Sequence, residues 1–136
     1  MRIVFGSDSD CALSSAVRDA LEERGHEVVQ VAAGEEWPEV GRAVARIVVS
    51  GGAERGVVCC WTGTGVTIAA NKVAGARAAL CTDATTAEGA RRWNDANILA
   101  FGLRLTSEEV AREMLDVFLS TEPDASERAA ISRVEG

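Results

Sequence analysis

Residues 57–72 read VVCCWTGTGVTIAANK, an apolar run that meets a glycine-rich loop and then a segment of helical character. The run belongs to an expected strand at 56–60, and the segment from about 65 to 73 has the composition of a helix start. Gly63 and Gly65 lie between them and allow the backbone to approach a ligand closely. The stretch therefore predicts a strand, a tight loop and a helix, with a thiol where the strand ends.

The same alternation of a short apolar run and a longer helical period recurs along the whole chain. The expected strands are 2–5, 27–31, 56–60, 77–81 and 97–101. The expected helices are 7–25, 39–50, 65–73, 83–93, 106–120 and a polar C-terminal helix at 124–134. This alternation predicts one α/β domain over residues 1–136, in which right-handed crossovers cover both faces of a parallel sheet with helices.

The composition narrows the classes of partner. The chain has 136 residues, 47% of them hydrophobic, which is enough to bury a core. Its formal net charge of −7 argues against nucleic acid or an anionic membrane as the main partner. Every apolar run falls short of the roughly 20 residues that span a bilayer, and Gly6, Ser7 and Asp8 interrupt the start of any signal peptide. We therefore expect a cytoplasmic protein.

The histidine and cysteine content limits the chemistry further. The only histidine, His26, follows Gly25 at an expected helix end, so neither a multi-histidine metal site nor a Ser-His-Asp triad is expected. The four cysteines are Cys11, Cys59, Cys60 and Cys81. They lack the CxxC spacing of metal sites and should be free thiols in a reducing compartment. The residue content therefore gives poor support to a metal site.

Cys60 lies at the carboxyl end of an expected strand, which is where ligands bind to parallel sheets. Backbone N–H groups of the following loop can hold an anion or a developing oxyanion. A thiol beside such a hole can act as a nucleophile or as a base that transfers protons. Alternatively, Cys60 is an ordinary small buried residue and the glycines form a turn. Cys59 points to the opposite face of the strand and is expected in the core.

Two longer stretches carry a resemblance to a known family. They are GTGVTIAANKVAGARAAL at 63–80 and RRWNDANILAFG at 91–102, together with GSDSD at 6–10. Over about residues 2–120 the chain closely resembles the ribose-5-phosphate isomerase B and galactose-6-phosphate isomerase family. The resemblance implies a Rossmann-like three-layer α/β/α fold with a five-stranded parallel sheet. It also implies a homodimer or homotetramer in which two subunits share each active site.

The resemblance also implies a reaction and its catalytic residues. Members of this family interconvert an aldose phosphate and a ketose phosphate through an enediolate, without metal or organic cofactor. On this likeness Cys60 is the base, Thr62 assists proton transfer, and the backbone of Gly63 and Gly65 lines the enediolate hole. In another branch of the family the base is a glutamate at the position of Val66, where a valine cannot serve.

The substrate-binding positions depart from the family pattern. Asp8 and Asn94 match it, but Ser9 and Trp93 stand where the family has histidines associated with phosphate binding and ring opening. The resemblance therefore implies that Asp8, Ser9, Trp93 and Asn94 line the substrate pocket, with the ring-opening chemistry altered.

The C-terminal segment departs from the pattern as well. The family holds the phosphate with two arginines four residues apart; Arg128 matches one, and Asp124 stands at the place of the other. A shifted alignment would bring in Arg133 instead. An aspartate in place of an arginine changes the charge by about two units and would repel a dianion.

The three tryptophans fall at or near these positions. Trp61 replaces a small residue after the catalytic cysteine, and Trp37 replaces the tyrosine of a Tyr-Pro pair. Aromatic faces suit the C–H surface of a sugar or a flat apolar group better than a phosphate, although Trp37 and Trp93 can equally fill core or subunit-interface space. We predict an isomerase of a sugar phosphate or modified sugar that is less charged, already open-chain or partly apolar.

Two alternatives remain. The first is a non-catalytic binding or scaffold paralogue, favoured by Asp124 and by the missing histidines. The second is an enzyme that uses Cys60 as a nucleophile, which is the weakest reading because no histidine lies nearby in the sequence to activate the thiol.

Overall fold

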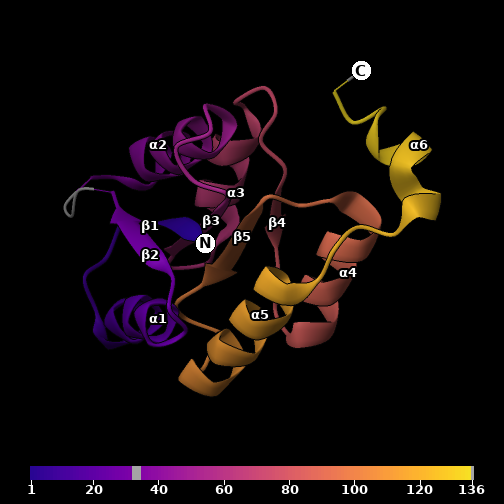
Figure 1. The fold of residues 1–136 in the computed structure, drawn as a ribbon. Helices are drawn as coiled ribbons and strands as arrows, with labels where there is room; N and C mark the ends of the chain where they lie inside the picture. Colours follow the sequence, from indigo (N-terminus) through magenta and orange to yellow (C-terminus); the bar gives the residue numbers. More distant parts are fainter. Residues whose placement is uncertain (32–34, 136) are drawn as a thin grey trace.

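The computed structural model of the protein describes residues 1–31 and 35–135. Its centre is a sheet of five parallel strands in the order β2-β1-β3-β5-β4 (Figure 1). The strands are β1 (Arg2–Ser7), β2 (Glu27–Gln30), β3 (Arg55–Cys60), β4 (Ala78–Leu80) and β5 (Ile98–Gly102). The predicted five-stranded parallel sheet is thus confirmed.

The helices form a layer on each side of the sheet. They are α1 (Ala12–Glu23), α2 (Trp37–Val49), α3 (Thr64–Asn71), α4 (Ala84–Asn94), α5 (Glu108–Ser120), the 3₁₀ turn η1 (Ala125–Glu127) and α6 (Arg128–Ile131). Helices α2 and α3 cover one face, and α1, α4 and α5 cover the other (Figure 1). Within residues 1–31 and 35–135, every helix is too short or too polar to cross a bilayer.

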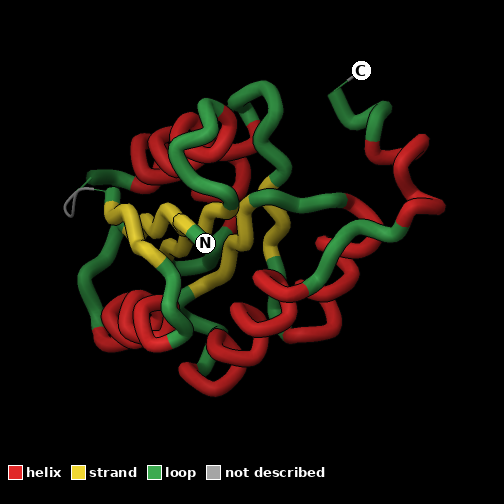
Figure 2. The backbone as a smooth tube through the Cα atoms, in the orientation of Figure 1, coloured by secondary structure: helices red, strands yellow, loops and turns green. Residues whose placement is uncertain are grey.

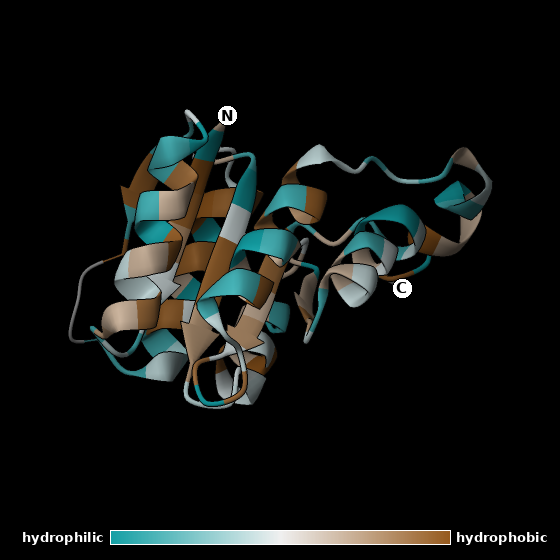
Figure 3. Ribbon diagram, turned by 90° about the horizontal axis from the view of Figure 1, so that it is seen from below, coloured by the Kyte–Doolittle hydropathy of each residue, from teal (hydrophilic) through white to brown (hydrophobic). Residues whose placement is uncertain are grey.

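Successive residues of each strand enter two different hydrophobic clusters. In β3, Val57 and Cys59 pack with α1, α4 and α5, whereas Val58 and Cys60 pack with α2 and α3. Because helices cover both faces, the central strands are continuous apolar runs. Figure 3 shows these apolar strands enclosed by helices with more polar outer faces.

The chain leaves β1 by a loop, so the expectation of a helix at 7–25 is wrong at its start. Ser7 still pairs with Cys59 in the sheet, and α1 begins only at Ala12. Cys11 is the residue before the helix, and its backbone N–H donates to the hydroxyl of Ser14 at 2.9 Å. The residues between β1 and α1 are therefore free to line a site at the carboxyl edge of the sheet.

The expected C-terminal helix at 124–134 is wrong in its extent. The structure has only η1 and α6 over 125–131, followed by turns at 132–135. The exposed Ala129 and Ala130 show that α6 buries no apolar stripe against the body of the subunit, and a short helix without such packing is marginal. The segment extends away from the sheet beside α4 (Figure 2).

Strand β4 forms one edge of the sheet and is completed by a side chain. The amide of Asn71, at the end of α3, donates to the carbonyl of Ala78 at 2.9 Å and accepts from its N–H at 2.8 Å. Asn71 thus occupies the hydrogen-bonding groups that a neighbouring strand would use, and it ties α3 to the sheet.

Candidate active site

The strand order creates a crevice between β1 and β3. The chain runs from β1 to β2 on one side and then returns to β3 on the other side of β1. Loops that leave adjacent strands in opposite directions open a crevice at the carboxyl ends, which is the usual ligand site of such sheets. Because Ser7 pairs with Cys59, the next residues, Asp8 and Cys60, emerge side by side at this crevice.

An open pocket of about 330 Å³ lies at this point. Its lining residues are Asp8, Trp37, Cys60, Trp61, Thr62, Thr64 and Gly65. All of them except Trp37 and Thr64 were predicted as catalytic or substrate-binding residues. The pocket therefore brings together, in one subunit, the thiol, the glycine loop and the aspartate that the sequence placed at the carboxyl ends of two strands.

Only one of the two adjacent cysteines faces this pocket. Cys60 is 5% exposed and lies on the α2–α3 side of β3, where it lines the pocket. Cys59 is fully buried on the other side, and burial raises the pKa of its thiol to about 12. Chemistry at the pocket thus belongs to Cys60.

The glycine loop is held tightly against β5. Gly63 has φ of +79°, and a Cβ there would lie 2.6 Å from Cδ1 of Leu80 and 2.7 Å from the carbonyl carbon of Phe101. A side chain is therefore excluded by both backbone conformation and space. The N–H groups of Leu103 and Arg104 donate to the carbonyls of residues 60 and 61, each at 2.9 Å. These bonds fix the loop relative to the sheet.

The start of α3 lies at the pocket. Helix α3 begins at Thr64, and the first N–H groups of any helix lack acceptors within their own helix. Such a helix start favours an anion. The hydroxyls of Thr62 and Thr64 are 2.7 Å apart and both are exposed. The start of α3 and a pair of hydroxyls thus line the same pocket as Cys60.

Two exposed indoles border the pocket. The ring of Trp37 lies against Gly65, where a Cβ would approach its Cε3 atom to 2.7 Å. Because Gly65 has no side chain, the indole ring of Trp37 can lie directly against the start of α3. The side chains of Trp37 and Trp61 are 44% and 63% exposed. They narrow the entrance and give it aromatic walls.

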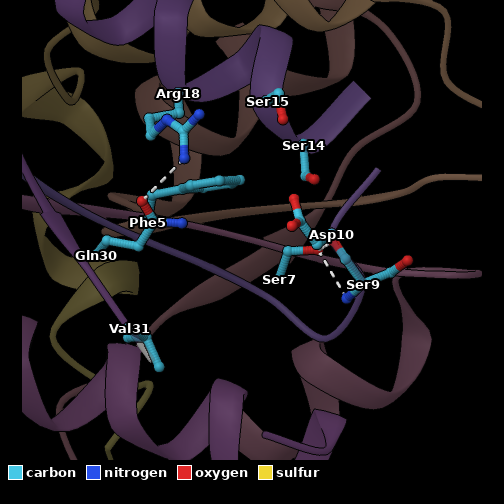
Figure 4. Close-up of a pocket in the computed structure, with 9 residues that line it drawn as sticks. All are labelled: Phe5, Ser7, Ser9, Asp10, Ser14, Ser15, Arg18, Gln30 and Val31. Carbon is cyan, nitrogen blue, oxygen red and sulfur yellow. Dashed lines mark hydrogen bonds between the residues drawn. The ribbon is translucent and has the colours of Figure 1, made fainter. Parts of the chain in front are cut away.

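Ser9 lies next to this pocket but lines a different hollow. That hollow, of about 100 Å³, lies between β1, β2 and the start of α1 (Figure 4). The hydroxyl of Ser7 donates to the carbonyl of Ser9 at 2.8 Å, and Arg18 donates to Gln30 across the far end. The turn at Ser7 thus separates Asp8, in the Cys60 pocket, from Ser9.

Trp93, Asn94 and Arg128 also lie outside the Cys60 pocket of their own subunit. Trp93 and Asn94 end α4, which covers the face of the sheet opposite to the Cys60 side. Asn94 lines a hollow with Asn71, and Arg128 lines another beside the C-terminal segment. One subunit alone therefore leaves these predicted substrate-binding residues apart from the thiol.

Two acidic residues near these positions, Asp95 and Asp124, form ion pairs with arginines. Asp95 accepts from Arg91 at 2.8 Å and from Arg77 at 3.2 Å, which makes it a structural partner of two arginines. Asp124 accepts from Arg92 through both carboxylate oxygens, at 3.2 and 3.1 Å. Its charge is therefore partly balanced by a neighbouring guanidinium.

Sequence reasoning gave no role to Thr64, and it marked Arg104 only as part of a segment that follows a strand end. Thr64 is the second threonine of the TGTG loop, and its contact with Thr62 depends on how the loop folds. Arg104 follows the carboxyl end of β5, and its backbone binds the carbonyl of Trp61. Its place after a strand end was the one available signal. In the part of the chain described, no group of three or more His, Cys, Asp or Glu side chains forms a metal cluster.

A doubly wound α/β sheet with a pocket at the carboxyl ends of its strands is typical of proteins that bind small molecules at that crevice. Residues 3–135 match the model of the family described as Ribose/Galactose Isomerase. The chain belongs to this family of sugar phosphate isomerases.

Individual members of the family are similar to this chain over most of its length. D-erythrulose-4-phosphate isomerase of Pectobacterium atrosepticum is 35% identical over 90% of this chain and 84% of its own. Ribose-5-phosphate isomerase B of Escherichia coli is 36% identical over 89% of this chain and 85% of its own. The structure of ribose-5-phosphate isomerase B of Clostridium thermocellum superposes with a TM-score of 0.93 at 38% identity, covering 99% of this chain and 95% of that one.

Proposed function

We propose that the protein is an aldose–ketose isomerase in which Cys60 is the base, and that its substrate is an open-chain sugar phosphate. The observation that carries the proposal is the position of Cys60, which lines the pocket beside the start of α3 and near Asp8. A base in this place can reach a substrate carbon while the helix start receives the negative charge that develops on oxygen.

The reaction needs only groups that this pocket contains. The thiolate of Cys60 takes the proton from the carbon next to the substrate carbonyl, and the C–H electron pair moves into an enediolate. N–H groups of the glycine loop and the start of α3 stabilise the enediolate oxygens. The hydroxyl of Thr62 moves a proton between these oxygens, and the thiol returns its proton to the neighbouring carbon. Atoms and charge balance without a cofactor.

An open-chain substrate accounts for the residues at positions 9 and 93. In the family pattern histidines there are associated with phosphate binding and ring opening, and this chain has Ser9 and Trp93. A four-carbon sugar with phosphate on O4 has no hydroxyl left to close a furanose ring, so it needs no ring-opening group. The relative from Pectobacterium atrosepticum is named for such a substrate, D-erythrulose 4-phosphate. Trp61 also narrows the entrance, which favours a short substrate.

A homodimer, alone or paired into a tetramer, would complete the site. Trp93, Asn94 and Arg128 lie away from the Cys60 pocket of their own subunit, so a second subunit would have to supply them. Exposed apolar side chains around the glycine loop support such a contact: Trp61, Ile68 and Leu105 are 63%, 59% and 74% exposed. Arg128 of the second subunit would then bind the phosphate.

The test is proton NMR in D2O with D-erythrulose 4-phosphate and, separately, ribose 5-phosphate. We expect deuterium to enter the carbon next to the carbonyl with erythrulose 4-phosphate, more slowly with ribose 5-phosphate, and not at all in Cys60→Ser. Cys11→Ala, a thiol change outside the pocket, is the matched control and should keep the wild-type rate. Faster turnover of ribose 5-phosphate would contradict the open-chain substrate, while exchange that survives Cys60→Ser would contradict the base.

One observation favours a second candidate, a non-catalytic binding paralogue. The hollow that contains Arg128 is also lined by Asp95, Glu122 and Asp124, an acidic setting that disfavours a phosphate. If folded wild-type protein exchanges no proton with either substrate, the binding paralogue replaces the isomerase.

A further inference from the structure

We propose that the ion pair between Arg92 and Asp124 is a positioning device, which fixes the start of the C-terminal segment and thereby the place at which Arg128 is presented to a substrate phosphate. The inference rests on the proposed function in one respect, the assignment of Arg128 as a phosphate ligand. It gives a role to an aspartate that stands where the family pattern has an arginine.

The pair joins the end of α4 to the C-terminal segment by three hydrogen bonds. The guanidinium of Arg92 donates through Nε to Oδ1 of Asp124 at 3.2 Å and through Nη2 to Oδ2 at 3.1 Å. The N–H of Asp124 donates to the backbone carbonyl of Arg92 at 2.8 Å. A two-point guanidinium–carboxylate contact fixes orientation as well as distance.

A second contact from α4 holds the segment just before the pair. The buried side chain of Arg91 donates through Nε to the carbonyl of Thr121 at 3.0 Å. Pro123 lies between the two anchor points and restricts its own backbone angle φ. The chain from Thr121 to Asp124 is thus tied to α4 at both ends, and α6 starts from a fixed point.

Arg128 follows Asp124 along the chain and is the first residue of α6. Asp124 and Arg128 line the same hollow of about 270 Å³, on the segment that extends away from the sheet (Figure 1). Residues 128–130 and 132–135 have mostly exposed side chains. The segment is held before Arg128 by Asp124 and, after it, by Glu135, whose carboxylate accepts from the N–H of Gly75 at 3.0 Å.

The same guanidinium also contacts the other motif expected in the substrate pocket. Arg92 lies over the ring of Trp93, with its Cζ atom 6.0 Å from the ring centroid. The ring itself lies against Gly89, where a Cβ would meet its Cζ3 atom at 2.7 Å. Arg92 thus links Trp93 and the C-terminal segment into one unit, which would approach a second subunit together.

Asp124→Asn distinguishes positioning from simple charge. If Asp124 only repels a phosphate, its neutralisation will strengthen phosphate binding, because a negative charge near Arg128 is removed. If Asp124 positions Arg128, the same change will weaken binding, because the two-point contact with Arg92 is lost. The two explanations predict opposite signs for one measurement. Because both side chains are partly exposed, at 44% and 33%, the variant should fold normally.

The experiment measures the affinity for inorganic phosphate by calorimetry, which needs no turnover. We expect Asp124→Asn and Arg92→Gln to weaken binding about fivefold to tenfold, as when a charge-assisted contact no longer holds a ligand residue. Asp124→Glu keeps the carboxylate and should restore most of the affinity. The matched control is Asp116→Asn, which removes a similar two-point contact with Arg24, between α1 and α5, and should leave binding unchanged.

Steady-state kinetics, measured as KM and kcat, provide a second test of the proposal. With the substrate that the wild-type protein turns over, Asp124→Asn should raise KM by a similar factor and leave kcat within about twofold, because the thiol is untouched. Phosphate binding that is equal or tighter in Asp124→Asn would overturn the proposal, as would a wild-type protein that binds no phosphate. If the binding pattern holds but no isomerisation occurs, the positioning role stands and the proposed function fails.

Discussion

Cys59 and Cys60 are adjacent in the chain yet lie in different hydrophobic clusters, on opposite faces of the sheet. Cys59 packs with α1, α4 and α5, and Cys60 lines the pocket on the α2–α3 side. The separation follows from the two-residue period of a strand, which sends consecutive side chains to opposite faces. One thiol is therefore part of the core, and its neighbour is available for chemistry.

Alkylation should distinguish the thiols of the folded protein. We expect iodoacetamide at pH 7.5 to modify Cys60 in the open pocket, and Cys11 at the start of α1, before Cys59 and Cys81. Burial raises the pKa of Cys59 and of Cys81 to about 12, so both stay protonated until the pH approaches that value. Burial also acts against ionisation of Cys11, but hydrogen bonds from Ser14 and Leu13 leave its pKa below the ordinary value.

The readout is peptide mass spectrometry over a time course. Modification of Cys59 at the rate of Cys60 would contradict the separation of the two faces. A phosphate-bearing substrate present during the reaction should protect Cys60 and leave the rate at Cys11 unchanged.

Gly63→Ala should cost far more stability than Gly25→Ala. Both glycines have positive φ, +79° and +83°, but a Cβ at Gly25 meets no atom within 4 Å. The change at Gly25 should therefore cost only backbone strain, about 1–2 kcal/mol. At Gly63 the methyl group would also overlap Leu80 and the backbone of Phe101, which adds about 1–3 kcal/mol. Urea unfolding measures both, and equal losses would show that the glycine loop is not held against β5.

Asp95→Asn should destabilise the fold rather than alter the chemistry. Asp95 has a left-handed backbone with φ of 48°, which asparagine also tolerates, so the change isolates the charge. The side chain of Arg91 is 1% exposed and would lose its carboxylate partner. Because Asp95 is partly exposed and Arg91 keeps its bonds to the carbonyls of Thr121 and Ala96, the loss should be about 1–3 kcal/mol. Asp124→Asn, at a partly exposed pair, should cost less than about 1 kcal/mol.

Thermal or urea unfolding of the two variants checks this order. A normal free energy of unfolding for Asp95→Asn, combined with a large loss of kcat, would instead place Asp95 in the reaction.

The pair between Arg24 and Asp116 should contribute stability only above acid pH. A hydrogen bond from Arg24 holds the pKa of Asp116 below its ordinary value. A carboxyl with a depressed folded-state pKa stabilises the fold above its unfolded pKa of about 3.9, and this contribution is lost as the pH falls through the folded pKa. Because Asp116 is largely exposed, the effect at pH 7 should be below about 1 kcal/mol.

The measurement compares the free energy of unfolding of the wild type with that of Asp116→Asn between pH 2 and pH 7. We expect the difference to be constant from about pH 5 upward and to vanish at the acid end. A difference that grows toward low pH would show that the carboxyl is protonated more easily in the folded state.

The sequence predicts the part of the candidate site that follows from strand periodicity and strand order. Cys60 and Asp8 could be placed together because each follows the end of a strand, and parallel strands end at one edge of the sheet. Cys59 could be assigned to the core for the same reason. The packing of Trp37 on Gly65 could not be derived, because it depends on how the loop before α2 returns to the sheet.

The sequence does not predict the separation of Asp8 from Ser9, or the position of Arg128. Ser9 turns away because the hydroxyl of Ser7 binds its carbonyl, a local contact that no periodicity contains. The expectation of a long C-terminal helix failed because helical composition does not supply a surface to pack on. Arg128 therefore lies on a short helix that follows the ion pair between Arg92 and Asp124.

The amide of Asn71 has a consequence for the behaviour of the protein at high concentration. An uncovered edge strand is a template on which strands of other chains can assemble. At Ala78 that template is already filled, because one side chain imitates the donor and the acceptor of a neighbouring strand. Asn71→Leu would remove both groups and reopen the edge at Ala78, so we expect the residue that anchors α3 also to limit the association of chains through β4.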